Sequence, residues 1–221
     1  MKLSKRTLGI FKTLSGVNDN IVFKTGKVQR AISQDSGVFV EAELDETFPH
    51  DVPICGLAQF VRNVECQEDA DLSFEDNKYV SIATEHGVMK FGYGAFALIK
   101  QVPEKTLEHS PTHYSFKITR DQMERIKKFA DINSFNTIDI ENDKGELYIS
   151  ARDRTNQDSP TARFKLGAAS ANMPAWDESF AYDRFSKIPF ADYDVKISPK
   201  MMGTFAGDRI TYFVAAERTQ K

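Results

Sequence analysis

Apolar residues at the start of the chain recur at the spacing of an α-helix. With about 100° of rotation per residue, one side of such a helix is apolar and the opposite side is cationic. The apolar side holds Leu3, Ile10, Phe11, Leu14 and Val17, with Leu8 at its edge. The cationic side holds Lys2, Lys5, Arg6 and Lys12. Ser4 is a suitable N-cap, so the pattern predicts an amphipathic helix that begins near Ser4 and ends before the turn residues that follow Val17.

After this helix the pattern changes to that of β-strands. Residues 20–24 and 27–33 are rich in residues that favour strands, and they flank a turn at Thr25 and Gly26. In residues 38–45, apolar and polar or acidic positions largely alternate. A period of two is expected of a strand with one buried face. The chain therefore begins with a predicted helix followed by a run of antiparallel strands.

The same order returns in the second half. Residues 3–18 align with residues 118–133 at a constant shift, which matches Ser4 with Thr119 and Lys12 with Lys127. Apolar pairs in the alignment are Leu3 with Ile118, Leu8 with Met123, Phe11 with Ile126, Leu14 with Phe129 and Val17 with Ile132. Residues 31–33 match 148–150, and residues 78–84 and 88–91 match 200–206 and 210–213. We interpret this as a duplicated unit whose loops differ in length, with the apolar pairs as core positions.

Residues 101–113 separate the two copies. This stretch is polar and contains Pro103 and Pro111, which is typical of a linker rather than a strand. The prediction is an α+β protein with a first domain at residues 1–100, a connector at 101–113 and a second domain at 114–221.

Each copy contains a second, shorter helical pattern. In residues 56–66 an apolar stripe lies opposite Arg62, and in residues 181–188 three apolar side chains lie opposite Arg184 and Lys187. The stripes are Leu57, Phe60, Val61 and Val64 in the first copy and Tyr182, Phe185 and Ile188 in the second. All four predicted helices thus carry cations on their outer faces, whereas carboxylates gather along residues 41–51 and 65–76.

Composition and charge narrow the class. The 221 residues are 41% hydrophobic and 28% charged, which is typical of a folded, soluble protein. No apolar run approaches the ~18 residues of a membrane span, and no signal peptide is expected at the cation-rich start. Only Cys55 and Cys66 are present, so we expect reduced thiols in an intracellular protein. The net charge is −3, yet residues 1–17 hold four cations and no carboxylate.

Other candidate chemistry is better explained by structure. His109 and His113 have the spacing of a metal pair, but Pro111 between them and the missing third ligand favour linker residues. Gly92 and Gly94, and the Thr25–Gly26–Lys27 turn, lack the remainder of a phosphate-binding loop. Cys55 is interpreted as a structural thiol, and Trp176 as a packing residue of a loop. A membrane-surface role for the first helix is disfavoured because its second copy carries Asp121 and Glu124.

The residues MKLSK at the start, the Thr25–Gly26 turn and HDVPICGLAQFV at 50–61 resemble the DNA polymerase sliding clamps, in particular those of T-even-type bacteriophages. The resemblance implies a homotrimeric ring of two-domain protomers, with sheets outside and helices lining the hole. It implies binding to duplex DNA without sequence specificity, tethering of DNA polymerase, and loading by a clamp-loader ATPase complex. Late-transcription factors are further implied partners, and the implied location is the cytoplasm of an infected bacterial host. Neither a cofactor, a metal nor a catalytic residue is implied.

The resemblance and the helical patterns together predict which residues face DNA and which bind partners. The predicted DNA-facing cations are Lys5, Arg6, Lys12, Arg62, Arg120, Lys127, Lys128 and Lys187. The predicted partner pocket beside the connector comprises Leu98, Ile99, Val102 and Pro103 with Tyr212 and Val214 of the last strand. Chains are expected to join head to tail through edge strands at residues 87–93 and 161–167. The alternative is a monomeric two-domain nucleic-acid-binding module that uses the same helices without encircling DNA; an enzyme is disfavoured.

Overall fold

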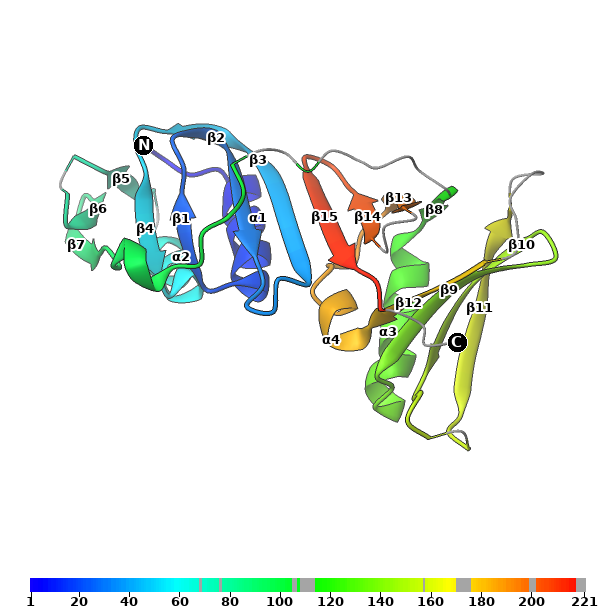
Figure 1. The fold of residues 1–221 in the computed structure, drawn as a ribbon. Helices are drawn as coiled ribbons and strands as arrows, with labels where there is room; N and C mark the ends of the chain where they lie inside the picture. The colour runs from blue at the N-terminus through cyan, green and yellow to red at the C-terminus, as the bar shows by residue number, and fades with distance from the viewer. Residues whose placement is uncertain are drawn as a thin grey trace. The chain divides into compact units, whose positions relative to one another are not determined.

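The computed structural model describes residues 1–67, 69–75, 77–104, 107, 114–156, 158–169, 176–198 and 202–217. The chain divides into two compact units, residues 1–106 and residues 107–221 (Figure 1). Most of the predicted connector lies outside the described residues, so the domain boundaries of the sequence analysis stay a prediction. Each unit is described by itself.

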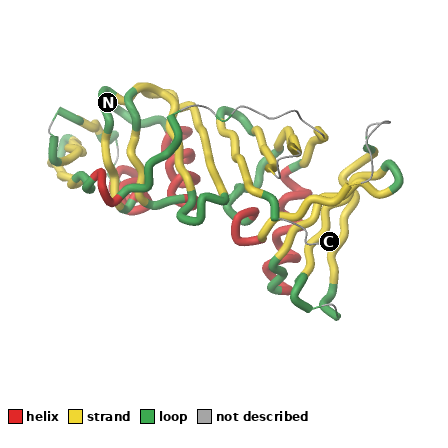
Figure 2. The backbone as a smooth tube through the Cα atoms, viewed as in Figure 1, coloured by secondary structure: helices red, strands yellow, loops and turns green. Residues whose placement is uncertain are grey.

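The first unit begins with a helix and continues with strands. Its elements are α1 (Lys5–Val17), β1 (Asn20–Phe23), β2 (Gly26–Ile32), β3 (Val38–Phe48), β4 (Val52–Cys55), α2 (Leu57–Glu65), β5 (Asp71–Ser73), β6 (Tyr79–Thr84), β7 (Gly87–Gly92) and the short 3₁₀ helix η1 (Phe96–Leu98). The strand pairs within this unit are antiparallel: β1 with β4, β2 with β3, and β6 with both β5 and β7. In Figure 2, α1 lies behind these strands.

The core of the first unit forms between α1 and the strands. Ile10, Phe11, Leu14 and Val17 are buried, as predicted, and Thr7 joins them. The Phe11 ring lies 4.4 Å from that of Phe23, and the Phe23 ring 4.7 Å from that of Phe48. Burial of such rings supplies a large part of the apolar stabilisation of the unit. The four apolar residues predicted on the second helix, α2, are also buried.

The second unit has a matching sequence of elements. They are β8 (Tyr114–Ile118), α3 (Arg120–Asn133), β9 (Thr137–Asp143), β10 (Glu146–Arg152), β11 (Thr161–Ala168), β12 (Trp176–Ala181), α4 (Tyr182–Phe185), β13 (Tyr193–Ser198), β14 (Met202–Ala206) and β15 (Ile210–Ala215). One antiparallel sheet has the order β11-β10-β9-β12. In another, β14 lies between β13 and β15, and β8 pairs with the other edge of β13.

The duplication predicted from the sequence is visible in the order of elements. Within the described residues, each copy runs helix, four strands, helix and three strands. Even the strand before α3 has a counterpart. β8, which precedes α3, pairs with β13. Met1, which precedes α1, contacts β5 in the same way: its carbonyl accepts from the Leu72 N–H at 2.9 Å, and its ammonium donates to the Leu72 carbonyl at 2.7 Å. The matched segments 31–33 and 148–150 lie in the corresponding strands β2 and β10.

The buried face of α3 differs from the one that the alignment predicted. Ser4 and Thr119 are the N-caps of α1 and α3, as the shift of the alignment requires. The buried residues of α3, however, are Met123, Ile126, Lys127 and Ala130. Phe129 is 42% exposed and Ile132 is 70% exposed, so these two are not core residues. One residue corresponds to about 100° on a helix, so the buried face of α3 is rotated by one position relative to that of α1.

The fourth predicted helix is shorter than expected. The pattern favoured a helix over residues 181–188, but α4 spans only Tyr182–Phe185. The Ser186 and Ile188 N–H groups donate to carbonyl groups within the turn, at 2.8 and 3.1 Å. Phe185 and Ile188 are nevertheless buried, so the apolar pattern correctly indicated which side chains face the core.

Candidate nucleic-acid interface and connector pocket

The first unit presents cations on two neighbouring helices. Lys5, Arg6 and Lys12 of α1 and Arg62 of α2 are exposed, as the helical pattern predicted. α1 and α2 pack against each other, and the Lys12 Nζ lies 2.7 Å from the Glu65 Oε1 of α2. This exposed ion pair contributes little to the stability of the helix packing, but it partly neutralises the charge of Lys12.

Carboxylates from the strands and loops lie at the starts of the helices. The Ser4 N–H donates to the Glu46 Oε1 at 2.5 Å, and the Ala58 N–H of α2 donates to the Asp19 Oδ1 at 2.6 Å. The Arg120 N–H of α3 donates to the Asp192 Oδ1 at 2.7 Å. An anion is favourable at a helix N-terminus, where free N–H groups and the helix dipole meet it. Carboxylates in both units therefore accept hydrogen bonds from helix N-termini, and they do not form a free acidic surface.

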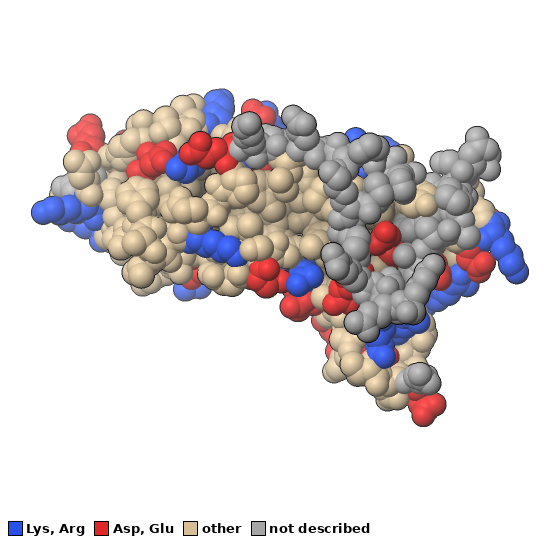
Figure 3. All heavy atoms as spheres, viewed as in Figure 1, with Lys and Arg blue, Asp and Glu red and all other residues tan. Residues whose placement is uncertain are grey.

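Acidic and basic side chains also mix on the surface. On the face drawn in Figure 3, Lys or Arg and Asp or Glu side chains of the first unit lie close together along its margins. On the second unit, Arg163 lies 2.6 Å from Glu141 and 3.0 Å from Asp143, and Lys165 lies 2.7 Å from Glu146. The strand faces therefore carry alternating charge, whereas the exposed face of α1 carries cations without carboxylates.

In the second unit the predicted cations divide into two groups. Arg120 and Lys128 of α3 are exposed, and Lys187 after α4 is half-buried. Lys127 is only 4% exposed, so the prediction that it faces outward is wrong. The pattern missed Arg125, which is exposed on α3 with its guanidinium 5.7 Å from the centre of the Phe164 ring.

The surroundings of Lys127 explain its burial. Its Nζ donates to the Ser186 carbonyl at 2.9 Å and to the Ile188 carbonyl. It also lies 5.9 Å from the centre of the Phe185 ring and 5.2 Å from that of Phe190. Burial lowers the pKa of Lys127 to about 8, and the nearby Asp131 carboxylate acts in the opposite direction. The ammonium therefore joins α3 to the turn after α4.

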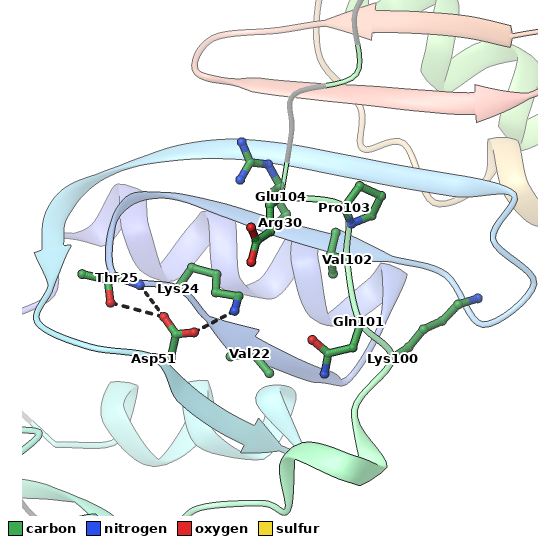
Figure 4. A pocket seen from close by; sticks show the side chains of 10 residues that line it. All are labelled: Val22, Lys24, Thr25, Arg30, Asp51, Lys100, Gln101, Val102, Pro103 and Glu104. Atoms are coloured by element: carbon green, nitrogen blue, oxygen red, sulfur yellow. Dashed lines mark hydrogen bonds and ion pairs between the residues drawn. The ribbon is translucent and has the colours of Figure 1, made fainter.

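A pocket lies where the connector begins. It has a volume of about 280 Å³ and is lined by Val22, Lys24, Thr25, Arg30, Asp51, Lys100, Gln101, Val102, Pro103 and Glu104 (Figure 4). Val102 and Pro103 were predicted pocket residues. Leu98 lies on η1 and is 76% exposed, and Ile99 is buried; neither lines this pocket. Tyr212 and Val214 are buried side chains of the second unit.

The pocket combines an apolar wall with fixed charges. Asp51 accepts from the Lys24 Nζ at 2.7 Å and from the Thr25 N–H at 2.9 Å. Burial alone would raise the pKa of Asp51, but the hydrogen bonds from Lys24 and Thr25 lower it below its ordinary value of 3.8. The Arg30 Nε lies 2.7 Å from the Glu41 Oε2. Val22, Val102 and Pro103 supply apolar surface, so the pocket suits a ligand with an apolar side chain and polar neighbours.

Two strands predicted to lie at sheet edges do so within the described residues. β7 ends the β5-β6-β7 sheet, and β11 ends the β11-β10-β9-β12 sheet. Beside β11, the Phe129 ring of α3 lies 5.3 Å from the Phe164 ring. With Ile132 these residues form an apolar patch that we call the β11 patch. On β7, Val88 is 65% exposed.

The remaining candidates have structural explanations or lie outside the described residues. The Gly94 N–H donates to the Pro53 carbonyl at 2.9 Å, and the absence of a side chain at Gly94 leaves room for the Cys55 sulfur. Gly26 has a φ of +105°, which the predicted turn requires. His109 and His113, and the side chain of Trp176, lie outside the described residues. In the described part of the chain, no three His, Cys, Asp or Glu side chains gather in a way that could hold a metal ion.

None of the described helices combines the length and the apolar character that a bilayer crossing demands.

Two units of matching topology, each with sheets and cationic helices, define the class: the chain has the DNA clamp fold. The solved structure of PCNA from A. fulgidus, bound to the C-terminal region of FEN-1, matches it with a TM-score of 0.68 at 12% identity, covering 97% of this chain and 96% of that one. No model of a protein family matches the sequence.

Curated relatives make the likeness more specific. The chain is 24% identical to the sliding clamp of Vibrio phage KVP40 over 222 residues, which cover 98% of this chain and 99% of the relative. It is 22% identical to the sliding clamp of Escherichia phage RB69, covering 98% of this chain and 97% of that protein. The similarity to phage sliding clamps therefore extends over nearly the whole chain.

Proposed function

We propose that this protein is a DNA polymerase sliding clamp: a ring that encircles duplex DNA and tethers the polymerase for processive synthesis. The observation that carries the proposal is similarity to phage sliding clamps along nearly the entire chain, combined with a duplicated clamp fold. In this proposal the protein acts without a cofactor, in the cytoplasm of an infected bacterial host. Its role is topological, so it needs no catalytic residue.

The proposed ring consists of three chains joined head to tail. β7 of one chain pairs with β11 of the next, a heterologous contact that a threefold rotation closes. Two exposed edges with apolar neighbours support this arrangement, because an edge strand that stays uncovered invites unspecific pairing. Charged side chains of both signs lie near the edges. Lys2, Asp69 and Glu85 line a hollow beside Val88 of β7, and Arg125 lies beside Phe164 of β11.

The proposed DNA contact is sparse and electrostatic. Lys5, Arg6, Lys12 and Arg62 of the first unit, and Arg120, Lys128 and Lys187 of the second, form the proposed inner lining. Duplex DNA carries about one negative charge per 1.7 Å of its axis, so scattered cations attract it in any register. Such contacts permit sliding because they do not read base edges. Lys127 is omitted from this set because its ammonium is bonded inside the unit.

The connector pocket is the proposed docking site for a segment of DNA polymerase. The PCNA neighbour was solved with the C-terminal region of FEN-1 bound to it, which supports a peptide as the ligand. The proposed site on this chain is the connector pocket, because it has an apolar wall beside fixed charges. An apolar side chain of the peptide would pack on Val102 and Pro103. The clamp-loader ATPase complex and late-transcription factors are further proposed partners, and they compete for the same ring.

The assembly is tested by light scattering over a dilution series. The wild-type chain is expected to have the mass of three chains at high concentration. Ile132→Asp places a charge in the β11 patch and should give monomers with an unchanged far-ultraviolet circular dichroism spectrum, because Ile132 is not a core residue. Leu98→Asp, an equally exposed apolar position outside the β11 patch, is the matched control and should remain trimeric. A wild-type monomer at every concentration would support the monomeric nucleic-acid-binding module instead.

A further inference from the structure

The segment that forms one wall of the connector pocket is tied to the first unit by one side chain. The Lys100 Nζ donates to the Ser33 carbonyl at 2.9 Å, to the Gln34 carbonyl at 2.6 Å and to the Ser36 Oγ at 2.6 Å. Three oxygens thus use all three donors of the ammonium. Among the described residues, the hydrogen bonds between residues 100–104 and the strands and turns of the first unit all come from this group.

The turn that receives Lys100 is itself rigid. It joins β2 to β3 and is closed by the Val38 N–H, which donates to the Ser33 Oγ at 2.9 Å, and by the Ser36 N–H, which donates to the Ser33 carbonyl at 2.9 Å. The Gly37 N–H donates to the Asp35 Oδ1 at 3.1 Å. Ser36 has a φ of +60°, a left-handed conformation that non-glycine residues adopt rarely. The three acceptors are therefore held in place independently of Lys100.

The position of Lys100 links this turn to the pocket. Ile99, immediately before it, is 4% exposed and fixes the chain on its other side. Gln101, Val102, Pro103 and Glu104, which follow directly, line the pocket. Figure 4 shows the Lys100 side chain extending away from the pocket while the chain continues along its wall. The ammonium thus contacts the turn, and its effect on a ligand passes through the wall.

We propose that Lys100 is a positioning residue for the partner pocket: its ammonium fastens the connector to the β2–β3 turn and thereby holds Val102 and Pro103 in the orientation that a docking peptide needs. This inference rests on the proposed function for the identity of the ligand. A wall that is held in place before binding lowers the ordering cost of association. The Lys100 ammonium therefore contributes to affinity through the position of the wall, since it contacts the turn and not the peptide.

The test uses the full-length chain and a synthetic peptide with the C-terminal sequence of the DNA polymerase from the same genome. Lys100→Met keeps the aliphatic stem and removes the three donors. It should weaken peptide binding about tenfold, the loss of one or two charge-assisted hydrogen bonds. The backbone order parameters of residues 101, 102 and 104, measured by NMR relaxation, should fall, because the ammonium no longer fastens this segment. Lys27→Met, which removes an exposed lysine that does not line the pocket, should change neither quantity.

Two further variants separate positioning from other effects. Lys100→Arg keeps the charge and several donors and should restore part of the affinity. Ser36→Ala removes one acceptor, so it should weaken binding less than Lys100→Met and add nothing in the Lys100→Met background. The midpoint of thermal unfolding serves as the check that the first unit remains folded in every variant.

The outcomes distinguish this inference from the proposed function. If Val102→Glu abolishes peptide binding while Lys100→Met binds as tightly as wild type, the pocket is the docking site and the role of Lys100 is refuted. If the wild-type chain does not bind the peptide, the proposed docking site fails, and the order parameters of the connector alone decide the role of Lys100. Unchanged order parameters in Lys100→Met would overturn it.

Discussion

Lys127 occupies a position where α3 otherwise buries apolar side chains. Its neighbours on the buried face are Met123, Ile126 and Ala130, and its ammonium reaches two carbonyl groups of the turn after α4. A buried ammonium is costly unless acceptors replace the water that it loses. The two carbonyls supply this replacement, and the Tyr182 hydroxyl donates to the Lys127 carbonyl at 3.1 Å. Lys127 is therefore a structural residue of the second unit.

The lowered pKa of Lys127 predicts a dependence of stability on pH. It is about 8 in the folded chain against an ordinary 10.5. Between these values the unfolded chain binds more protons, so the free energy of unfolding contributed by this group rises with pH. From about pH 8 to pH 10, wild type should gain on the order of 1 to 3 kcal/mol relative to Lys127→Met. Urea unfolding of both proteins at several pH values measures the difference.

The matched control for this measurement is Lys128→Met, which removes the exposed lysine next in the chain. It should leave the slope of stability against pH as in wild type. Parallel curves for wild type and Lys127→Met would contradict the assignment of a buried, titrating ammonium. The range stops at pH 10 because burial, followed by the interaction with Asp131, raises the pKa of Tyr182 above its ordinary 10.0 and adds a separate effect at higher pH.

At the scale of elements, three helices, α1, α2 and α3, begin where a carboxylate from elsewhere in the chain meets them. α2 is the clearest case, because its N-cap is Gly56, which has no side chain to cap the helix. Asp19, which immediately precedes β1, supplies the acceptor for the Ala58 N–H. The Asp19 backbone carbonyl also accepts from the Leu57 N–H at 2.8 Å. The loop after α1 therefore determines where α2 starts.

Asp19→Ala should lower the free energy of unfolding by about 1 kcal/mol, the usual cost of losing an N-cap acceptor. Asp19→Asn keeps an acceptor oxygen and should retain most of that stability. Glu124→Ala, at an exposed position of α3, is the control for the loss of one carboxylate. Denaturant midpoints at neutral pH give all three values. A loss in Asp19→Ala no larger than in the control would show that Asp19 does not cap α2.

Some elements could be predicted from the sequence and others could not. The face of α1 and the strands after it follow from local periodicity. The edge positions of β7 and β11 were expected from the resemblance to sliding clamps. The face of α3 could not be obtained from residue type, because Phe129 and Ile132 look like core residues until a sheet edge is placed beside them. The carboxylates at the helix starts are missed because Asp19 and Ala58, or Glu46 and Ser4, are far apart in the sequence.

The residues of the connector pocket could also be predicted only in part from the sequence. Val102 and Pro103 were found from their apolar character beside a linker. Lys24 and Asp51 belong to the same pocket only because β1 pairs antiparallel with β4, which brings Phe23 opposite Val52. Such a register depends on the packing of the whole unit, and no local pattern in the sequence contains it.

At the scale of the whole molecule, the proposed function requires cations on helices rather than on sheets. Changing Lys5, Lys12 and Lys128 together to Ala should weaken binding to duplex DNA and make it less dependent on salt, because fewer counterions are released. The ring should remain intact, since all three side chains are exposed. Fluorescence anisotropy with labelled duplex DNA over a series of salt concentrations measures both effects.

The control variant removes the same charge from strands and turns by changing Lys117, Lys144 and Lys196 to Ala. All three are exposed in the second unit and lie outside the helices. This variant should keep the wild-type salt dependence. Equal effects in the two triple variants would mean that net charge, and not the helix face, controls the interaction with DNA.

The proposed ring holds DNA by encircling it, and its topology can be tested directly. The labelled protein is loaded on nicked circular DNA with the clamp-loader ATPase complex from the same genome, the DNA is isolated by gel filtration, and half of the sample is then cut once with a restriction enzyme. We expect the protein to stay on the circles and to be lost from the linear DNA, from whose ends a ring slides off. Equal retention on circular and linear DNA would contradict encirclement and favour direct binding by a nucleic-acid-binding module.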